Sequence, residues 1–235
     1  MDVKERLDEI CDRIKASTIK SGRMAGDVTL IAVSKTFPSS AVTGVSSLGQ
    51  VDFGENKVQE LVLKSGELEN GTSDHPIRWH MIGHLQRNKA KDIVGRADMF
   101  HALDSVRLAS ALQARLKAEE LTLDCLIQVN ISAEDSKFGI LPDELKLFAE
   151  QIAPLDAINI RGLMTLASPT NSPESVRPEF AQMRDLSEML TECLGYPTPV
   201  LSMGMSSDFE VAIEEGATHV RIGSAIFGAR TYLNT

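Results

Sequence analysis

The sequence predicts an α/β protein, a single-domain (β/α)8 TIM barrel with an extra N-terminal helix. Eight short apolar runs bounded by turn formers alternate with segments whose apolar residues recur at helical spacing. The 235 residues give about 29 residues per unit, close to the roughly 30 of a βα repeat. The alternative, a doubly wound open sheet, lacks the Gly-x-Gly-x-x-Gly that usually links its first strand to a helix. We expect one domain over 1–235, with the extra helix in 1–25 and the barrel in 29–228.

The helices between the strands are predicted from caps and periodicity. Asp104 is placed to cap the helix after the fourth strand, and Pro142 suits the first position of a later helix. The stripe from Val176 to Cys193, with steps of four and three, is interpreted as core. The extra N-terminal helix is expected to cover the closed end of the barrel or to pair with another subunit. The predicted strands are Leu30–Thr36, Val51–Asn56, Ile77–His84, Met99–Leu103, Leu123–Asn130, Ile158–Leu166, Pro199–Met203 and His219–Ile222.

Composition excludes several classes of protein. Lys and Arg total 24 against 33 Asp and Glu, and no basic stripe with interleaved aromatic residues occurs, so neither nucleic acid nor an anionic membrane is expected as a partner. The charged N-terminus and the lack of a long apolar run indicate a cytoplasmic protein. The three cysteines are far apart and form no Cys-x-x-Cys pair, so we expect reduced, mostly buried thiols and neither a disulfide framework nor a metal site.

Lys35 is the first candidate for chemistry. It ends the run Leu-Ile-Ala-Val-Ser-Lys-Thr, and strand alternation puts Ile31, Val33 and Lys35 on one face, which in a closed barrel points to its mouth. Desolvation lowers the pKa of a lysine, and a neutral amine can attack an aldehyde and hold it as a Schiff base. The alternative is a lysine that extends from a strand end into water, and the strand alone leaves both interpretations open.

The loops after strands seven and eight are where such barrels bind phosphate. The seventh strand leads into Ser202-Met203-Gly204-Met205-Ser206-Ser207-Asp208, and the eighth into Arg221-Ile222-Gly223-Ser224-Ala225. Both are small, and the first is also rich in hydroxyl groups, which lets an oxyanion approach backbone N–H groups. Helix capping by Ser206 or Ser207 and tight packing at Gly223 are the alternatives. A pattern that suits phosphate occurs at both of the loops where such barrels bind it, and this coincidence favours phosphate binding.

Six motifs in the expected order resemble the pyridoxal phosphate homeostasis protein family, single-domain relatives of the alanine racemase barrel. The resemblance implies that Lys35 carries pyridoxal 5′-phosphate (PLP) as a Schiff base, and that Ser206, Gly223 and Ser224 hold its phosphate. It further implies that Arg221 faces the pyridine nitrogen and that Asn56 lies beside the ring. The motifs are Val33-Ser34-Lys35, Phe53-Gly54-Glu55-Asn56, His80-Met81-Ile82-Gly83-His84-Leu85-Gln86, Gly162-Leu163-Met164-Thr165, Ser202-Met203-Gly204-Met205-Ser206 and Arg221-Ile222-Gly223-Ser224-Ala225-Ile226-Phe227-Gly228.

The residues around the implied ring favour a carrier over a robust catalyst. Arg221 only donates hydrogen bonds, which leaves the pyridine nitrogen unprotonated and makes the ring a weak electron sink. Met164, at the end of strand six, makes that wall of the site apolar. Racemisation needs proton transfer on both faces of the substrate, and Tyr232 is poorly suited to be the second acid/base group. Lys35 is therefore the one expected catalytic residue.

Four other residues have simpler interpretations beside functional ones. Asn56 and Gln59 have the spacing of a capping box, which is compatible with ring contact by Asn56. His80 and His84 share a strand face by parity without the ligands of a metal site, and His84 is expected to line the mouth. Lys137 is interpreted as a solvated loop lysine, and contact with an incoming phosphate or aldehyde at the mouth is the alternative.

Three classes of function remain open from the sequence. The first is a PLP-binding protein that takes part in intracellular homeostasis of PLP, and the second is a weak PLP-dependent amino-acid racemase or lyase. The third is a barrel enzyme of sugar-phosphate metabolism that uses Lys35 as an aldolase-type Schiff base without PLP. The partners expected for the first class are PLP and PLP-dependent apo-enzymes, and the chain is expected to be a monomer or a weak homodimer.

Overall fold

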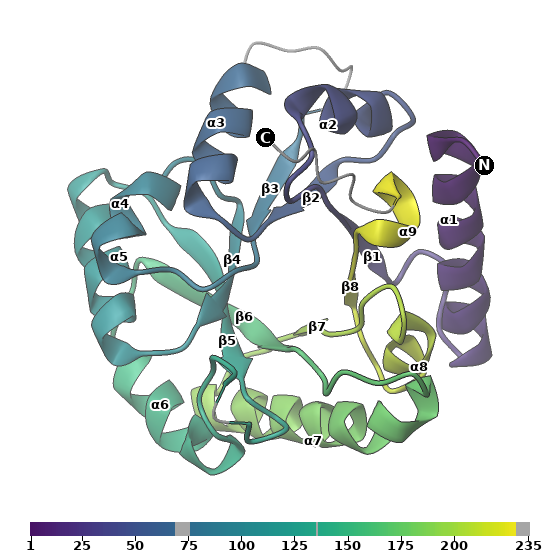
Figure 1. Ribbon diagram of the computed structural model, residues 1–235. Helices are drawn as coiled ribbons and strands as arrows, with labels where there is room; N and C mark the ends of the chain where they lie inside the picture. Colours follow the sequence, from purple (N-terminus) through teal and green to yellow (C-terminus); the bar gives the residue numbers. More distant parts are fainter. Residues whose placement is uncertain (69–75, 135, 229–235) are drawn as a thin grey trace.

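The computed structural model describes residues 1–68, 76–134 and 136–228 of the chain. Eight parallel strands close into a barrel in sequence order, with β1 paired to both β2 and β8. Figure 1 shows the barrel ringed by helices. The predicted (β/α)8 fold is confirmed. The strands are β1 Thr29–Val33, β2 Asp52–Glu55, β3 Arg78–Met81, β4 Met99–Leu103, β5 Leu123–Val129, β6 Ile158–Thr165, β7 Val200–Ser202 and β8 His219–Ile222.

The helices follow the strands, as a βα repeat requires. Three short 3-10 segments accompany them: η1 Arg87–Lys89, η2 Pro142–Glu144 and η3 Pro173–Val176. The α-helices are α1 Val3–Lys20, α2 Ser39–Ser46, α3 Val58–Leu68, α4 Ala90–Ile93, α5 Val106–Ala118, α6 Leu145–Ile152, α7 Arg177–Leu194, α8 Phe209–Glu214 and α9 Ser224–Phe227.

The core lies between the strands and the ring of helices. Phe180, Met183 and Leu190, from the predicted stripe on α7, are fully buried. Burying each such side chain contributes about 1.5–3 kcal/mol to folding. On β1 the alternation is as predicted for Ile31 and Val33, because both approach the position of Gly54 on the neighbouring strand.

Two strands, β1 and β3, end three residues earlier than the apolar pattern predicts. β3 stops at Met81 although the apolar run continues, because at Gly83 the chain passes against the loop after β2. A Cβ atom on Gly83 would lie 2.2 Å from the Asn56 carbonyl oxygen, so only glycine allows this approach. The prediction that His84 shares a strand face with His80 is therefore wrong, since His84 lies beyond the strand.

Helix α1 lies beside the barrel, next to α8 and α9 (Figure 1), and the prediction that it covers the closed end is wrong. Arg6 donates to the Ile226 carbonyl at 2.6 Å near the mouth, whereas Arg23, just after the helix, donates to the Ala217 carbonyl at 2.9 Å at the start of β8. The helix thus spans the barrel's length. Its capping box, formed by Asp2 and Glu5, explains why the helix begins at Val3.

The thiols and the helices bear on two of the predictions made from composition. Cys125 is buried, but Cys11 is exposed and Cys193 only partly buried, so the prediction of mostly buried thiols is wrong. Cys11 lies on α1 and Cys193 on α7, where Cys193 packs against the edge of the core. Within the described ranges, no helix combines the length and the hydropathy needed to cross a membrane.

Candidate functional site

Lys35 lies in a turn at the carboxyl end of β1 and not on the strand itself. The strand ends at Val33, two residues before Lys35, so the predicted extension to Thr36 is wrong. The turn forms because the Phe37 N–H donates to the Ser34 carbonyl at 3.0 Å and Thr36 takes φ +69°. Lys35 is partly buried. Its position at the barrel mouth is set by this turn and not by strand alternation.

A buried ion pair between Lys64 and Glu55 holds the start of that turn in place. The Lys64 Nζ atom lies 2.6 Å from Glu55 Oε1 and donates to the Ser34 carbonyl at 2.8 Å. Ser34 in turn donates its hydroxyl to Glu55 at 2.6 Å. Burial raises the pKa of Glu55 despite the opposing effect of Lys64 and Ser34. Sequence reasoning missed this cluster. The available signal was the helical spacing of Val58, Leu61 and Lys64, which continues an apolar stripe with a lysine.

The two predicted phosphate loops come together at the mouth. Ser224 donates its hydroxyl to that of Ser206 at 3.3 Å. A Cβ atom on Gly223 would lie 3.0 Å from the Val33 carbonyl oxygen, so the end of β1 packs directly against this loop. The Met205 N–H, by contrast, is already engaged, because it donates to Asp208 at 2.6 Å.

Aromatic stacking joins the Lys35 turn to the same loops. The rings of Phe37, two residues after Lys35, and Phe227 on α9 stack with centroids 5.1 Å apart. Helix α9 begins at Ser224, so this contact ties the turn to the helix that follows Gly223. Sequence reasoning did not predict this contact.

Arg221 is buried inside the barrel, as its place on β8 predicts. Its Nη1 donates to Ser202 Oγ at 2.7 Å and its Nη2 donates to the Thr165 carbonyl at 2.7 Å. Burial lowers the pKa of Arg221 to about 10, which leaves the guanidinium protonated at neutral pH. Two bonds from one planar group fix its orientation. Arg221 pairs in register with Ile31 on β1.

Two further predicted site residues, Met164 and Asn56, lie near strand ends. Met164 is fully buried on β6. Asn56 follows β2, but the Glu60 and Leu61 N–H groups donate to the Lys57 carbonyl, so Lys57 is the N-cap and the predicted capping box of Asn56 is wrong.

His84 lies in the loop after β3 and contacts two other loops. Its ring stacks on Phe138 at 3.9 Å, and its Nδ1 lies 3.1 Å from Asp104. Because Asp104 pairs with His84, it does not cap α5 as predicted. Ser105 is the N-cap instead and accepts from the Leu108 N–H at 3.4 Å.

Lys137 joins the loops after β5 and β6, and the prediction that it is solvated is wrong. Its Nζ lies 3.0 Å from Ser132 Oγ and 3.2 Å from the Ala167 carbonyl, and 2.7 Å from Glu134. Only 17% of its side chain is exposed. Near Ile140 the chain folds back on β5, because the Ile140 N–H donates to the Gln128 carbonyl at 2.9 Å, which the sequence does not indicate.

Comparison with known proteins matches this arrangement over nearly the whole chain. The model of the alanine racemase N-terminal domain matches residues 11–231. A pyridoxal phosphate homeostasis protein of Aquifex aeolicus (strain VF5) is 40% identical over 232 residues, which are 99% of this chain and 100% of the relative. Its counterpart in Escherichia coli (strain K12) is 41% identical over 234 residues, covering 98% of each chain. This chain belongs to the pyridoxal phosphate homeostasis protein family.

Solved structures extend the comparison for this homeostasis-family chain. PipY of Synechococcus elongatus PCC7942, solved without PLP, is 34% identical with a TM-score of 0.85, over 97% of this chain and 100% of PipY. PipY with PLP bound is 32% identical with a TM-score of 0.83, over the same shares of the two chains. Alanine racemase from Corynebacterium glutamicum is 17% identical with a TM-score of 0.66, and this chain covers 63% of it. The last likeness concerns the fold alone.

His219 makes the stability of this homeostasis-family chain depend on pH. Burial on β8 lowers the pKa of His219 from 6.5 to about 4. Between these values the unfolded chain binds a proton that the folded chain does not, so stability is full above pH 6.5 and falls as the pH decreases. The loss reaches about 3 kcal/mol, since one pKa unit corresponds to about 1.4 kcal/mol. Urea unfolding at pH 7 and pH 4.5 measures it, and His219→Asn should reduce the difference. An equal difference in the variant would contradict the assignment.

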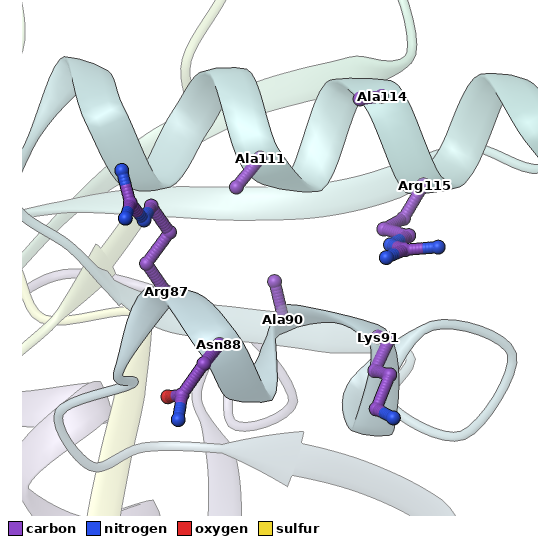
Figure 2. Close-up of a pocket in the computed structure, with 7 residues that line it drawn as sticks. All are labelled: Arg87, Asn88, Ala90, Lys91, Ala111, Ala114 and Arg115. Atoms are coloured by element: carbon purple, nitrogen blue, oxygen red, sulfur yellow. The ribbon is translucent and has the colours of Figure 1, made fainter.

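The described residues also form a surface cleft of about 360 Å³ between η1, α4 and α5 (Figure 2). Figure 2 shows Ala90 on α4 and Ala111 on α5 pointing toward each other across the cleft, with Arg87 at one end and Arg115 at the other. The residues that line the cleft include none of the predicted site residues of this family member, so the cleft is separate from the mouth.

Proposed function

We propose that this chain binds PLP at the barrel mouth, holds it as a Schiff base on Lys35, and takes part in the intracellular homeostasis of PLP. The Lys35 amine condenses with the aldehyde with loss of one water molecule. Ser206, Gly223 and Ser224 hold the phosphate, and Arg221 faces the ring nitrogen. Asn56, His84 and Met164 border the ring.

The contact of β1 with the loop after β8 is the observation that carries this proposal. Val33 packs on Gly223, and Phe37 stacks on Phe227, so the turn with Lys35 is held beside the Ser206 and Ser224 hydroxyls. An amine next to a small, hydroxyl-bearing loop fits an aldehyde that carries a phosphate ester. Pyridoxal phosphate homeostasis proteins of about 40% identity, and PipY with PLP bound, support the same reading.

The chain's own residues favour storage over turnover. When bound, PLP supplies a reactive aldehyde and a ring that withdraws electrons according to the charge on its nitrogen. The Arg221 guanidinium stays protonated at neutral pH and only donates hydrogen bonds there. On β6, Met164 has no proton to transfer, and the Thr165 hydroxyl is engaged with the Val129 carbonyl at 2.8 Å. Tyr232 lies outside the described residues. PLP-dependent apo-enzymes are the proposed recipients, and a monomer or weak homodimer the proposed state.

Borohydride reduction followed by peptide mass mapping tests the proposal. The protein incubated with PLP should carry one pyridoxyl group on Lys35, and Lys35→Ala should lose it completely together with the absorption band of the bound cofactor. Lys117→Ala is the matched control, because Lys117 is exposed and pairs only with Asp156 among the partners seen in the described part of the chain.

Two outcomes would overturn it. If added PLP does not bind to the protein, an aldolase-type barrel enzyme is favoured. If Lys35→Ala carries the pyridoxyl group to the same extent, Lys35 is not the residue that binds PLP. Chiral analysis of amino acids after long incubation separates the carrier from a weak racemase, since we expect no racemisation above that of free PLP.

A further inference from the structure

A continuous chain of hydrogen bonds crosses the barrel interior from its closed end to Arg221. Asp52 Oδ1 lies 2.9 Å from His80 Nε2, and His80 Nδ1 lies 2.9 Å from His101 Nε2. His101 Nδ1 lies 3.0 Å from Ser202 Oγ, which accepts from Arg221 at 2.7 Å. All five side chains are buried, and those of His101 and Ser202 completely so. Four different strands contribute to this path before it reaches β8.

The two ends of the chain determine where each proton lies. At one end the guanidinium of Arg221 only donates, so Ser202 Oγ accepts from it and the Ser202 hydroxyl proton is left to donate to His101 Nδ1. At the other end Asp52 is a carboxylate: burial raises its pKa, but hydrogen bonds from His80 and Arg78 outweigh that effect and lower it. His80 therefore donates from Nε2 to Asp52. A neutral His80 then accepts at Nδ1 from His101 Nε2, so both rings are assigned as Nε2–H tautomers.

The ionisable groups around the chain agree with this assignment. Burial lowers the pKa of His101 well below 6.5, and the nearby cation Arg221 lowers it further, so His101 is neutral at pH 7. Arg78 closes the far end with two bonds to Asp52, at 2.8 and 2.6 Å. The ring of His219 lies near that of His80, with centroids 6.4 Å apart. The negative charge of Asp208 raises the pKa of Arg221 and so opposes the effect of burial. Every donor in the chain points from the cation Arg221 to the anion Asp52, which is the favourable direction.

We propose that Asp52, His80, His101 and Ser202 form a one-way hydrogen-bond chain that positions Arg221 toward the ring nitrogen of PLP. This inference rests on the proposed function. The chain fixes Nη1 through Ser202 while the Thr165 carbonyl fixes Nη2, so the plane of the guanidinium is set before any ligand enters. The four residues are positioning residues, since they act on PLP only through Arg221.

The tautomers are measured first, in the protein without PLP. Long-range proton–nitrogen NMR correlations of the histidine rings should show Nε2–H tautomers for both His80 and His101. His101→Gln and His80→Gln assign the signals among the five histidines of the chain. An Nδ1–H tautomer or a protonated ring at either position at pH 7 would overturn the chain, whatever the protein does with PLP.

Ser202→Ala tests the effect on the site. It removes the donor to His101, so the His101 ring signals should shift, and the dissociation constant for PLP should rise about tenfold. With Arg221 less restrained, the pH midpoint at which the absorption of bound PLP responds to ring-nitrogen protonation should rise by about one unit. Ser202→Thr keeps the hydroxyl and should restore the midpoint.

Ser46→Ala is the matched control, because Ser46 is a buried serine on α2 that is not part of the chain. If Ser202→Ala and Ser46→Ala give the same PLP absorption profile, Ser202 has only a structural role and the inference is wrong. Failure of the wild-type protein to bind PLP would refute the proposed function instead, while the tautomer measurement still decides whether the chain exists.

Discussion

Replacing Lys64 with methionine should lower the free energy of unfolding by about 3–5 kcal/mol, the usual cost of removing one partner of a buried ion pair. Only 3% of the Lys64 side chain and 0% of the Glu55 side chain are exposed. Without Lys64, Glu55 would remain buried with one fewer donor, and the Ser34 carbonyl would lose the 2.8 Å bond that Lys64 gives it. Urea unfolding at pH 7 measures the change.

Two companion variants make this result specific to burial. Lys117→Met removes an exposed pair with Asp156 and should cost less than about 1 kcal/mol. Lys64→Met combined with Glu55→Leu removes both charges and should recover most of the loss, because an apolar pair of similar volume needs no desolvation of charge. A loss below about 1 kcal/mol for Lys64→Met would show that the pair adds little.

Lys64→Met should also affect the site, because Ser34 begins the turn that carries Lys35. Glu60 holds the other side of this turn by accepting from the Thr36 N–H at 2.5 Å. We expect the Schiff base that borohydride reduces to form more slowly in the variant, and still on Lys35. The rate of borohydride-trapped labelling reports this separately from stability. Labelling as fast as in the wild type would limit Lys64 to a structural role.

Gly162→Ala should prevent folding of the barrel, with a cost above about 4 kcal/mol, a size reserved for severe core defects. Gly162 has φ +151°, and a Cβ atom there would lie 1.8 Å from the Val200 carbonyl oxygen. Gly162 and Val200 are paired in register between β6 and β7, so neither strand can move without breaking the ladder. Loss of soluble protein and of the cooperative urea transition are the expected observations.

Gly44→Ala is the control for this substitution. Gly44 lies inside α2, and a Cβ atom there would have nothing within 4 Å. Alanine in a helix interior is favoured over glycine, so this variant should be more stable by about 0.5–1 kcal/mol. If Gly162→Ala unfolded as cooperatively as Gly44→Ala, the close approach of β6 and β7 would not be a requirement of the fold.

The sequence predicted the order of strands well because burial on both faces leaves a local signal. β4 Met99–Leu103 and β8 His219–Ile222 have the predicted bounds. Strand ends were less predictable. The chain leaves β1 after Val33 in a tight turn at Ser34, and it leaves β3 after Met81 because Gly83 passes against the loop after β2. Apolar periodicity along one segment carries no record of such contacts.

The sequence by itself determined that eight βα units follow one another, and that Lys35, Arg221 and Gly223 fall at or near carboxyl ends of strands, where parallel barrels gather their functional groups. Only the tertiary structure decided which buried polar groups pair. His101 and Ser202 are 101 residues apart, and Lys64 meets Ser34 across 30 residues. His101 and Ser202 meet across the interior of the closed barrel, and Lys64 meets Ser34 because α3 packs beside the end of β1, so both pairs depend on distance in space and not on distance along the chain.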